Sequence, residues 1–108
     1  MSPQREESAT AVLESNQRQA MSDEVGKRLA TLGALLELKE ALAQGDLKAA
    51  QACRDKRLIL AVDLFIGDRK RHDALQQLFD ESGRWVRGSG SDSKVGEALK
   101  RAIPLFEH

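Results

Sequence analysis

Residues 25–66 read VGKRLATLGALLELKEALAQGDLKAAQACRDKRLILAVDLFI, and this stretch decides the fold. Its leucines recur at helical spacing over about forty residues, more often than a single helix-to-core contact requires. The interior of the chain holds no proline, the strongest helix breaker, because Pro3 and Pro104 lie near the two ends. The pattern therefore predicts long helices.

The first long helix of this stretch carries two apolar stripes. Ser22 is a suitable N-cap, and Gly45 is a natural left-handed stop after Gln44. Side chains within about 60° of one another form the first stripe, which consists of Val25, Leu29, Leu32 and Leu36. The second stripe consists of Leu35, Leu38 and Leu42. Such a wide arc predicts two neighbours. We assign the second stripe to a partner or second copy, although spacing alone leaves open which stripe faces the core.

The remaining helices are predicted from caps and stops. Asp46 begins a helix over residues 47–66, and Asp68 begins another that Gly83 ends. Residues 58–66 (LILAVDLFI) are also compatible with a buried strand, but no second strand is available to pair with it. A last helix is expected from residue 93 to residue 104. We therefore expect an all-α bundle of four to five helices built around an αα-hairpin, with breaks near Gly45, Gly67 and Gly83.

The length of 108 residues predicts one domain, residues 1–108, with one core. Residues 1–21 are polar, with Val12 and Leu13 as their bulky aliphatic side chains, so we expect a mobile arm or a marginal helix there. Residues 84–93 (RWVRGSGSDS) have the composition of a flexible Gly/Ser loop.

Charge and cysteine content narrow the partners and the compartment. The chain has 17 basic and 17 acidic residues, so it has no long-range field that would hold it on nucleic acid or on an anionic membrane. Cys53 is the single cysteine, which favours a reducing compartment. The apolar run 58–66 is far shorter than the ~20 residues of a membrane span. The N-terminus does not resemble a signal peptide. We expect a cytoplasmic protein.

The sequence contains no motif for catalysis, a cofactor or a metal. The loop from Gly88 to Lys94 lacks the pattern of a phosphate-binding loop. Cys53 has no predicted base beside it, and His72 with its two neighbouring aspartates offers too few ligands for zinc. We expect no enzymatic activity, no cofactor and no metal.

Trp85, flanked by arginines at the edge of the loop, is a candidate interface anchor, with a core plug at the bundle end as the alternative. Arg69 and Arg71 are expected to supply charge at the rim, and Phe106 belongs to an apolar tail. The candidate partner- or dimer-binding residues are Leu35, Leu38, Leu42, Arg69, Arg71, Trp85 and Phe106.

The chain has more leucine than one core contact requires and no motif for catalysis, a cofactor or a metal. This combination predicts a small regulator that binds another protein and inhibits or sequesters it. The classes expected are an antiactivator of a transcription regulator and an escort chaperone for an export substrate, in either case as a homodimer. The alternative is a nucleic-acid-binding module that uses the basic clusters at residues 54–57 and 69–72.

One family resemblance supports the escort interpretation. Residues 35–47 and 57–60 combine leucines, a Gly-Asp turn and then an arginine followed by leucines. This arrangement is similar to the helical hairpin of flagellar-type export chaperones. The resemblance covers about a quarter of the chain and implies a helical hairpin that binds a protein. We transfer no site residue from it.

Overall fold

The structure is a computed structural model that describes residues 24–107. Every regular element in this part of the chain is a helix, so the predicted all-α bundle is confirmed there. The helices cover residues 24–44, α2 (Leu47–Cys53), the π-helical segment η1 (Arg54–Leu58), α3 (Ile59–Leu64), α4 (Arg69–Val86) and α5 (Asp92–Phe106). Because α2, η1 and α3 follow one another without a break, the described chain forms four helical rods. The predicted N-terminal arm lies outside the described residues.

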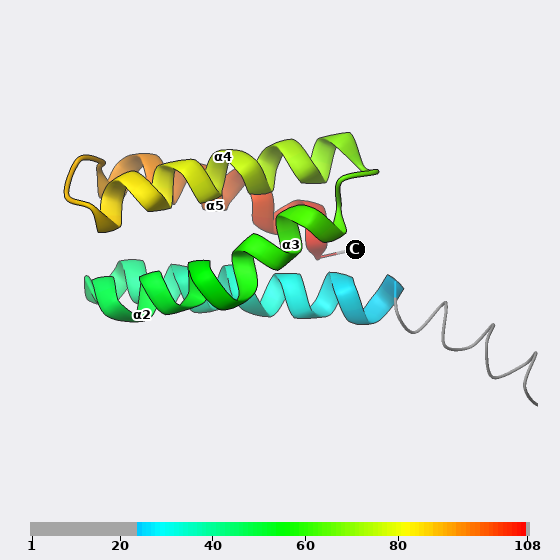
Figure 1. Cartoon of the computed structure of the whole chain (residues 1–108), viewed down its shortest axis with the longest axis horizontal. Helices are drawn as coiled ribbons and strands as arrows, with labels where there is room; N and C mark the ends of the chain where they lie inside the picture. The colour runs from blue at the N-terminus through cyan, green and yellow to red at the C-terminus, as the bar shows by residue number, and fades with distance from the viewer. Residues whose placement is uncertain (1–23, 108) are drawn as a thin grey trace, which may run out of the picture.

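The rods pack as two layers around one core. In Figure 1, α4 and α5 lie side by side in one layer, and the helix of residues 24–44 lies beside α2 in the other. The α3 segment runs obliquely between the layers and leads into α4. The largest fully buried aliphatic side chains come from every rod: Leu35, Leu38, Leu58, Leu75, Leu78 and Val95.

Two glycines with positive φ end helices. Gly45 has a φ of 65°, and the N–H of Asp46 donates to the carbonyl of Ala41 at 2.9 Å. Gly88 has a φ of 83°, and the N–H of Ser89 donates to the carbonyl of Arg84 at 2.9 Å. Both arrangements satisfy carbonyls that a helix end would otherwise leave without a donor, and only glycine enters this conformation cheaply.

The predicted break at Gly83 is therefore wrong, because α4 continues through Gly83 to Val86. The following loop is also shorter than predicted, since Ser91 caps α5 by accepting a hydrogen bond from the N–H of Lys94 at 3.3 Å. Pro104 does not end α5 either. It lies in the last turn, where its missing N–H removes a single hydrogen bond near the helix end.

The C-terminal turn of α5 is held by two arginines from other helices. Arg28 donates to the carbonyl of Phe106 at 2.8 Å, and Arg71 donates to the carbonyl of Leu105 at 2.8 Å. Cations suit this negative end of the helix dipole. The ring of Phe106 packs edge-on against Phe65, with 5.0 Å between ring centroids. These contacts join α5 to the helix of residues 24–44, to α4 and to the end of the second rod at one end of the bundle.

The π-helical segment η1 corrects the register of the second rod. In an uninterrupted α-helix, Arg57 would lie on the same face as Cys53 and Arg54, which are both buried. The N–H of Ile59 instead donates to the carbonyl of Arg54, which is the i→i+5 pattern of a π-helix. The extra residue lets Leu58 continue the buried face, while Arg57 lies exposed.

Arg54 is the charged residue that the bundle buries most deeply among those described, with 6% of its surface exposed. Its guanidinium donates to Ser82 Oγ at 3.0 Å and to the carbonyl of Phe79 at 3.1 Å, and it lies 4.3 Å from the centre of the Phe79 ring. Burial lowers the pKa of Arg54, against the opposing effect of Asp55. A Cβ at Gly83 would lie 2.6 Å from Arg54 Nη2, so Gly83 makes room for the buried cation.

Candidate protein-binding surfaces

Most of the predicted binding residues lie inside the bundle. Leu35, Leu38 and Phe106 have no exposed surface, and Trp85 is 8% exposed. These four side chains, which the sequence assigned to a partner or a second copy, therefore lie in the core of the folded chain and not on its surface. Spacing located both stripes of the helix of residues 24–44 but did not show which one meets α2 and α5.

Trp85 is a plug at the end of the bundle, the alternative that the sequence left open. The α4–α5 loop folds closely over it, because a Cβ at Gly90 would lie 2.6 Å from the backbone nitrogen of Trp85. The neighbouring Arg84 pairs with Glu81 at 3.0 Å within α4. Trp85 therefore contributes to stability and is not available as an anchor.

The other three predicted residues lie at or near the surface, but the structure does not bring them together. Leu42 is half-buried and lines a groove of about 280 Å³ between the helix of residues 24–44 and α5. Arg69 is 95% exposed at the start of α4, 4.0 Å from Asp73. Arg71 is half-buried and holds the end of α5. The seven predicted residues therefore do not form one site.

The basic clusters behind the nucleic-acid alternative are also divided. Arg54 is buried, and Arg57 is bound to the carboxylate of Glu37 and to the carbonyl of Ala30. In the second cluster, Arg71 faces α5 and pairs with Asp68 at 3.6 Å. Arg57, although exposed, is engaged in these contacts, so Lys56, Arg69 and Lys70 are the other exposed cations of the two clusters, which is too few side chains for a continuous phosphate-binding surface.

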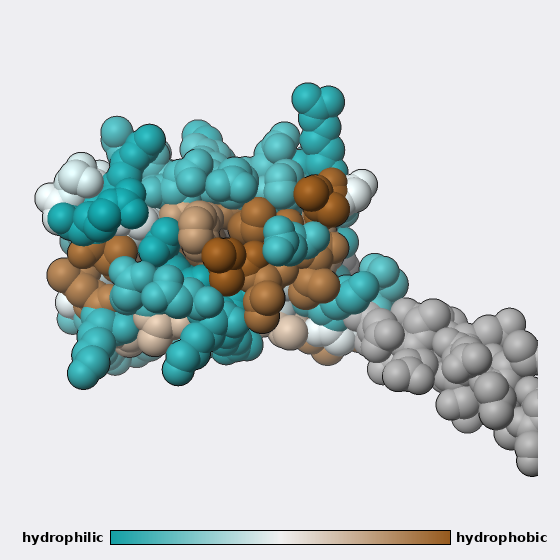
Figure 2. Space-filling model, viewed as in Figure 1, coloured by the Kyte–Doolittle hydropathy of each residue, from teal (hydrophilic) through white to brown (hydrophobic). Residues whose placement is uncertain are grey.

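A different group of residues forms an apolar surface on α3. Ile59, Leu60, Leu64 and Ile66 lie within eight successive residues and are 46%, 58%, 49% and 72% exposed, respectively. We call these four residues the α3 surface. In Figure 2, brown hydrophobic side chains gather in the middle of the face on which α3 lies. The sequence indicates this surface through residues 58–66 (LILAVDLFI), which place apolar side chains nearly all round the helix. Only one side of the helix packs against the core, so the other apolar side chains are left exposed.

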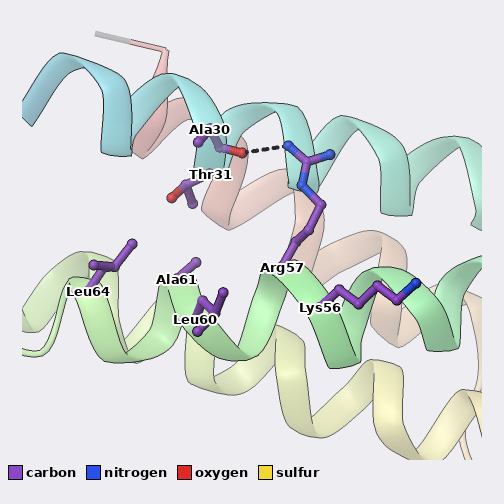
Figure 3. Close-up of a pocket in the computed structure, with 7 residues that line it drawn as sticks. All are labelled: Ala30, Thr31, Lys56, Arg57, Leu60, Ala61 and Leu64. Atoms are coloured by element: carbon purple, nitrogen blue, oxygen red, sulfur yellow. Dashed lines mark hydrogen bonds between the residues drawn. The ribbon is translucent and has the colours of Figure 1, made fainter. Parts of the chain in front are cut away.

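A groove borders the α3 surface. It has a volume of about 160 Å³ and lies between α3 and the helix of residues 24–44. Figure 3 shows Leu60, Ala61 and Leu64 on one side, opposite Ala30 and Thr31. Lys56 and Arg57 lie at one end, where Arg57 crosses to the opposite helix and donates to the carbonyl of Ala30 at 3.1 Å. The groove is therefore mainly apolar, with positive charge at one end.

A second exposed apolar group lies on the helix of residues 24–44. Val25, Leu29 and Leu36 are 48%, 51% and 48% exposed, and Leu32 is half-buried beside them. We call these four residues the outer stripe. At 100° per residue they lie on the side of the helix roughly opposite Leu38. The first stripe recognised in the sequence thus faces solvent, except at Leu32, which also packs against the core.

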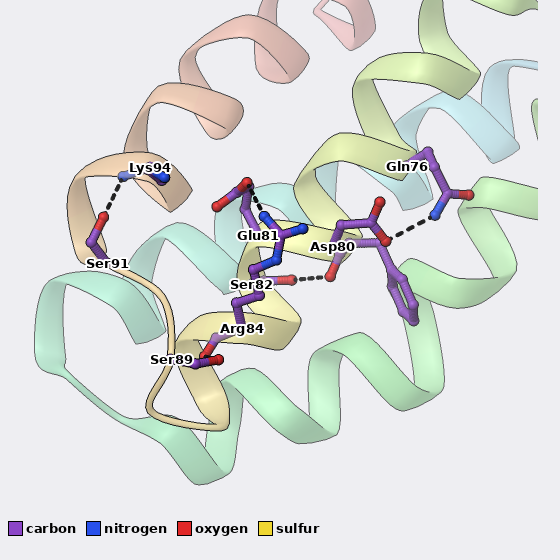
Figure 4. Close-up of polar contacts among 9 residues, drawn as sticks. Gln76, Asp80, Glu81, Ser82, Arg84, Ser89, Ser91 and Lys94 are labelled. Carbon is purple, nitrogen blue, oxygen red and sulfur yellow. Dashed lines mark hydrogen bonds and ion pairs between the residues drawn. The ribbon is translucent and has the colours of Figure 1, made fainter.

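The polar end of α4 does not form a reactive centre. Figure 4 shows that its contacts are local: Gln76 donates to Asp80 at 3.1 Å, and Ser82 donates to the carbonyl of Phe79 at 3.1 Å. Glu81 pairs with Arg84 through one carboxylate oxygen, and its other oxygen is buried without a hydrogen bond. These contacts stabilise turns of one helix and converge on no common point.

Cys53 is held in the core. Its thiol donates to the carbonyl of Ala34 at 3.3 Å, and burial raises its pKa from 9.0 to about 11, with a smaller contribution from Glu37. Such a thiol is protonated at neutral pH and is a poor nucleophile. Within residues 24–107, His, Cys, Asp and Glu side chains do not gather in groups that would hold a metal ion.

No helix in the described part of the chain combines the length and hydropathy that crossing a membrane requires. Comparisons with protein-family models, curated proteins and solved structures found no significant match. The resemblance to flagellar-type export chaperones therefore gains no support from them. The exposed apolar surfaces are the ground on which we propose a function.

Proposed function

We propose that this protein is a non-enzymatic regulator that binds another protein through the α3 surface and inhibits or sequesters it. The observation that carries the proposal is the exposure of Ile59, Leu60 and Leu64 on α3 and of Ile66 in the turn that follows it. Isolated exposed leucines are common on monomers, but four large exposed side chains within eight residues, two of which line a groove, are typical of a binding site.

The groove favours a helix as the bound element. Its small residues, Ala30 and Ala61, leave space between the two rods, and Leu60 and Leu64 provide an apolar wall. An amphipathic helix laid in such a groove buries residues spaced three and four apart. Lys56 at the end of the groove would meet an acidic residue that follows the apolar stripe of the partner.

The partner classes that we propose are a transcription regulator and an export substrate, both cytoplasmic. Covering an apolar helix of such a protein would block the dimerisation or assembly that the helix serves. The divided basic clusters give the nucleic-acid alternative no specific support, so we do not propose it as a second function.

The proposal is tested by capture from a lysate of the native host with the wild-type chain, Leu60→Glu and Leu47→Glu. Leu47 is a matched control, because it is 45% exposed on α2, outside the α3 surface. Leu60→Glu should fold normally and lose the specifically bound protein, since a buried unpaired carboxylate costs several kcal/mol. Leu47→Glu should retain it. Equal capture by all three chains would contradict the proposal.

A further inference from the structure

We propose that the outer stripe pairs with the outer stripe of a second copy of the chain, in antiparallel orientation. This inference goes beyond the proposed partner binding and uses other residues, so either can fail without the other. It also replaces the dimer predicted from Leu35 and Leu38, because both are in the core.

The spacing of the outer stripe is the first argument. Val25, Leu29, Leu32 and Leu36 follow one another at intervals of four, three and four residues. This alternation is the a/d pattern of a two-stranded coiled coil. The core of the bundle occupies the opposite side of this helix and reaches only Leu32 of the stripe, so Val25, Leu29 and Leu36 are left exposed within the described chain. An unpartnered a/d stripe is suited to another helix with the same stripe.

Gly26, on one flank of the stripe, is the second, independent observation. Gly33 lies seven residues further along the same flank, but a Cβ there would lie 3.1 Å from Arg57 Nη2, so a contact inside the chain accounts for that glycine. Glycine weakens a helix interior, so its presence there calls for a packing reason. A Cβ at Gly26 would meet nothing within 4 Å, so no contact within residues 24–107 requires this glycine. Gly26 allows a second helix to approach closely at this end of the stripe.

Lys39 decides the orientation. It continues the a/d pattern three residues after Leu36, and no hydrogen bond or ion pair partners it among residues 24–107. In a parallel pair the two copies of Lys39 would face each other, and like charges in contact are destabilising. An antiparallel pair in which Val25 of one copy meets Leu36 of the other avoids this contact. Leu29 then meets Leu32 of the second copy, so all four layers are apolar.

In this register, with Val25 against Leu36 of the second copy, Gly26 of each chain lies near Gly33 of the other on the same flank, where Arg57 of that other chain packs. The contact between the two outer stripes, which we call the seam, provides four apolar positions per copy, whereas a stable interface contains roughly 20–30 residues a side. We therefore expect the dimer to be weak and reversible, with a dissociation constant of roughly tens to hundreds of micromolar.

Sedimentation equilibrium of the full chain over this concentration range tests the pairing. The wild-type chain should show a monomer–dimer equilibrium, and Leu29→Glu should raise its dissociation constant about 100-fold or more, because the seam then buries unpaired charge. Leu47→Glu, which changes an equally exposed leucine off the stripe, should leave it unchanged. A wild-type chain that remains monomeric at hundreds of micromolar would overturn the proposal, as would equal dissociation by both variants.

Disulfide trapping tests the orientation. In a Cys53→Ser background, a chain with Val25→Cys is mixed with a chain with Leu36→Cys under mild oxidation. The antiparallel register predicts that the mixed disulfide forms faster than either symmetric one. Faster formation of the two symmetric disulfides would show a parallel pair and refute the register. Gly26→Leu provides a further check, because it should weaken the dimer while helix content is retained or increased.

Discussion

Replacing Gly83 with alanine should destabilise the protein, although the same change stabilises most helix interiors. Gly83 lies in α4, where a Cβ would be 2.6 Å from Nη2 and 3.2 Å from Cζ of Arg54. Real Cβ contacts are not this short, so the guanidinium must move. It cannot move without breaking its bonds to Ser82 Oγ and to the carbonyl of Phe79, at 3.0 and 3.1 Å.

The size of the effect follows from these contacts. A hydrogen bond from a charged donor contributes about 1.5–3 kcal/mol, and the lower end applies because a displaced guanidinium regains water. Two such bonds amount to about 3 kcal/mol. Alanine in place of glycine returns about 1 kcal/mol of helix propensity. The net loss in the free energy of unfolding should therefore be about 2 kcal/mol.

Urea unfolding followed by far-ultraviolet circular dichroism measures this value. The control is Gly96→Ala in α5, where a Cβ meets only Leu42 Cδ2, at 3.9 Å, and should stabilise the protein by roughly 0.5–1 kcal/mol. In an Arg54→Met background, Gly83→Ala should also stabilise, since the obstacle is gone. If Gly83→Ala stabilises the wild-type chain, or if its effect does not depend on Arg54, the explanation of the buried arginine is wrong.

Three further predictions concern the core. Cys53 should react slowly with thiol reagents at pH 8 until the chain is unfolded by urea. Its pKa in the native state is about 11, above the usual 9.0, so the native state holds the thiol proton more tightly than the unfolded state does. The free energy of unfolding should therefore fall as pH rises from about 9 towards 11. Leu38→Ala should cost about 3 kcal/mol in urea unfolding, whereas Leu47→Ala, at an exposed site, should change stability by less than about 0.5 kcal/mol. Trp85→Ala should lower stability by about 3–5 kcal/mol, and any variant that still folds should retain partner capture, since Trp85 lies inside the bundle.

The fold class was predictable because helical spacing, caps and the lack of internal proline all agree. Glycine was harder to interpret. Gly45 and Gly83 look alike in sequence, yet Gly45 takes a left-handed turn and Gly83 makes room for a side chain from another rod. That second role depends on Arg54, which lies 29 positions earlier, and no local pattern shows it.

The binding surfaces were predictable in kind but not in position. Spacing identified two stripes on the helix of residues 24–44, but both have similar hydrophobicity, and only packing against α2 and α5 selects Leu38 for the core over Leu36. The π-helical segment rotates the second rod, so the exposed side of α3 could not be assigned from regular helical spacing. Trp85 illustrates the same limit, because composition suits an interface anchor and a buried plug equally.

The central claim, that the α3 surface binds another protein, is tested most directly by photocrosslinking in cells of the native host. A benzoylphenylalanine residue is placed at position 60 on the α3 surface or, as a control, at position 97, where Glu97 is exposed on α5. We expect a discrete adduct with one other protein from position 60, absent from position 97 and lost when Leu64→Glu is added. No adduct from position 60, or the same adducts from both positions, would contradict the claim.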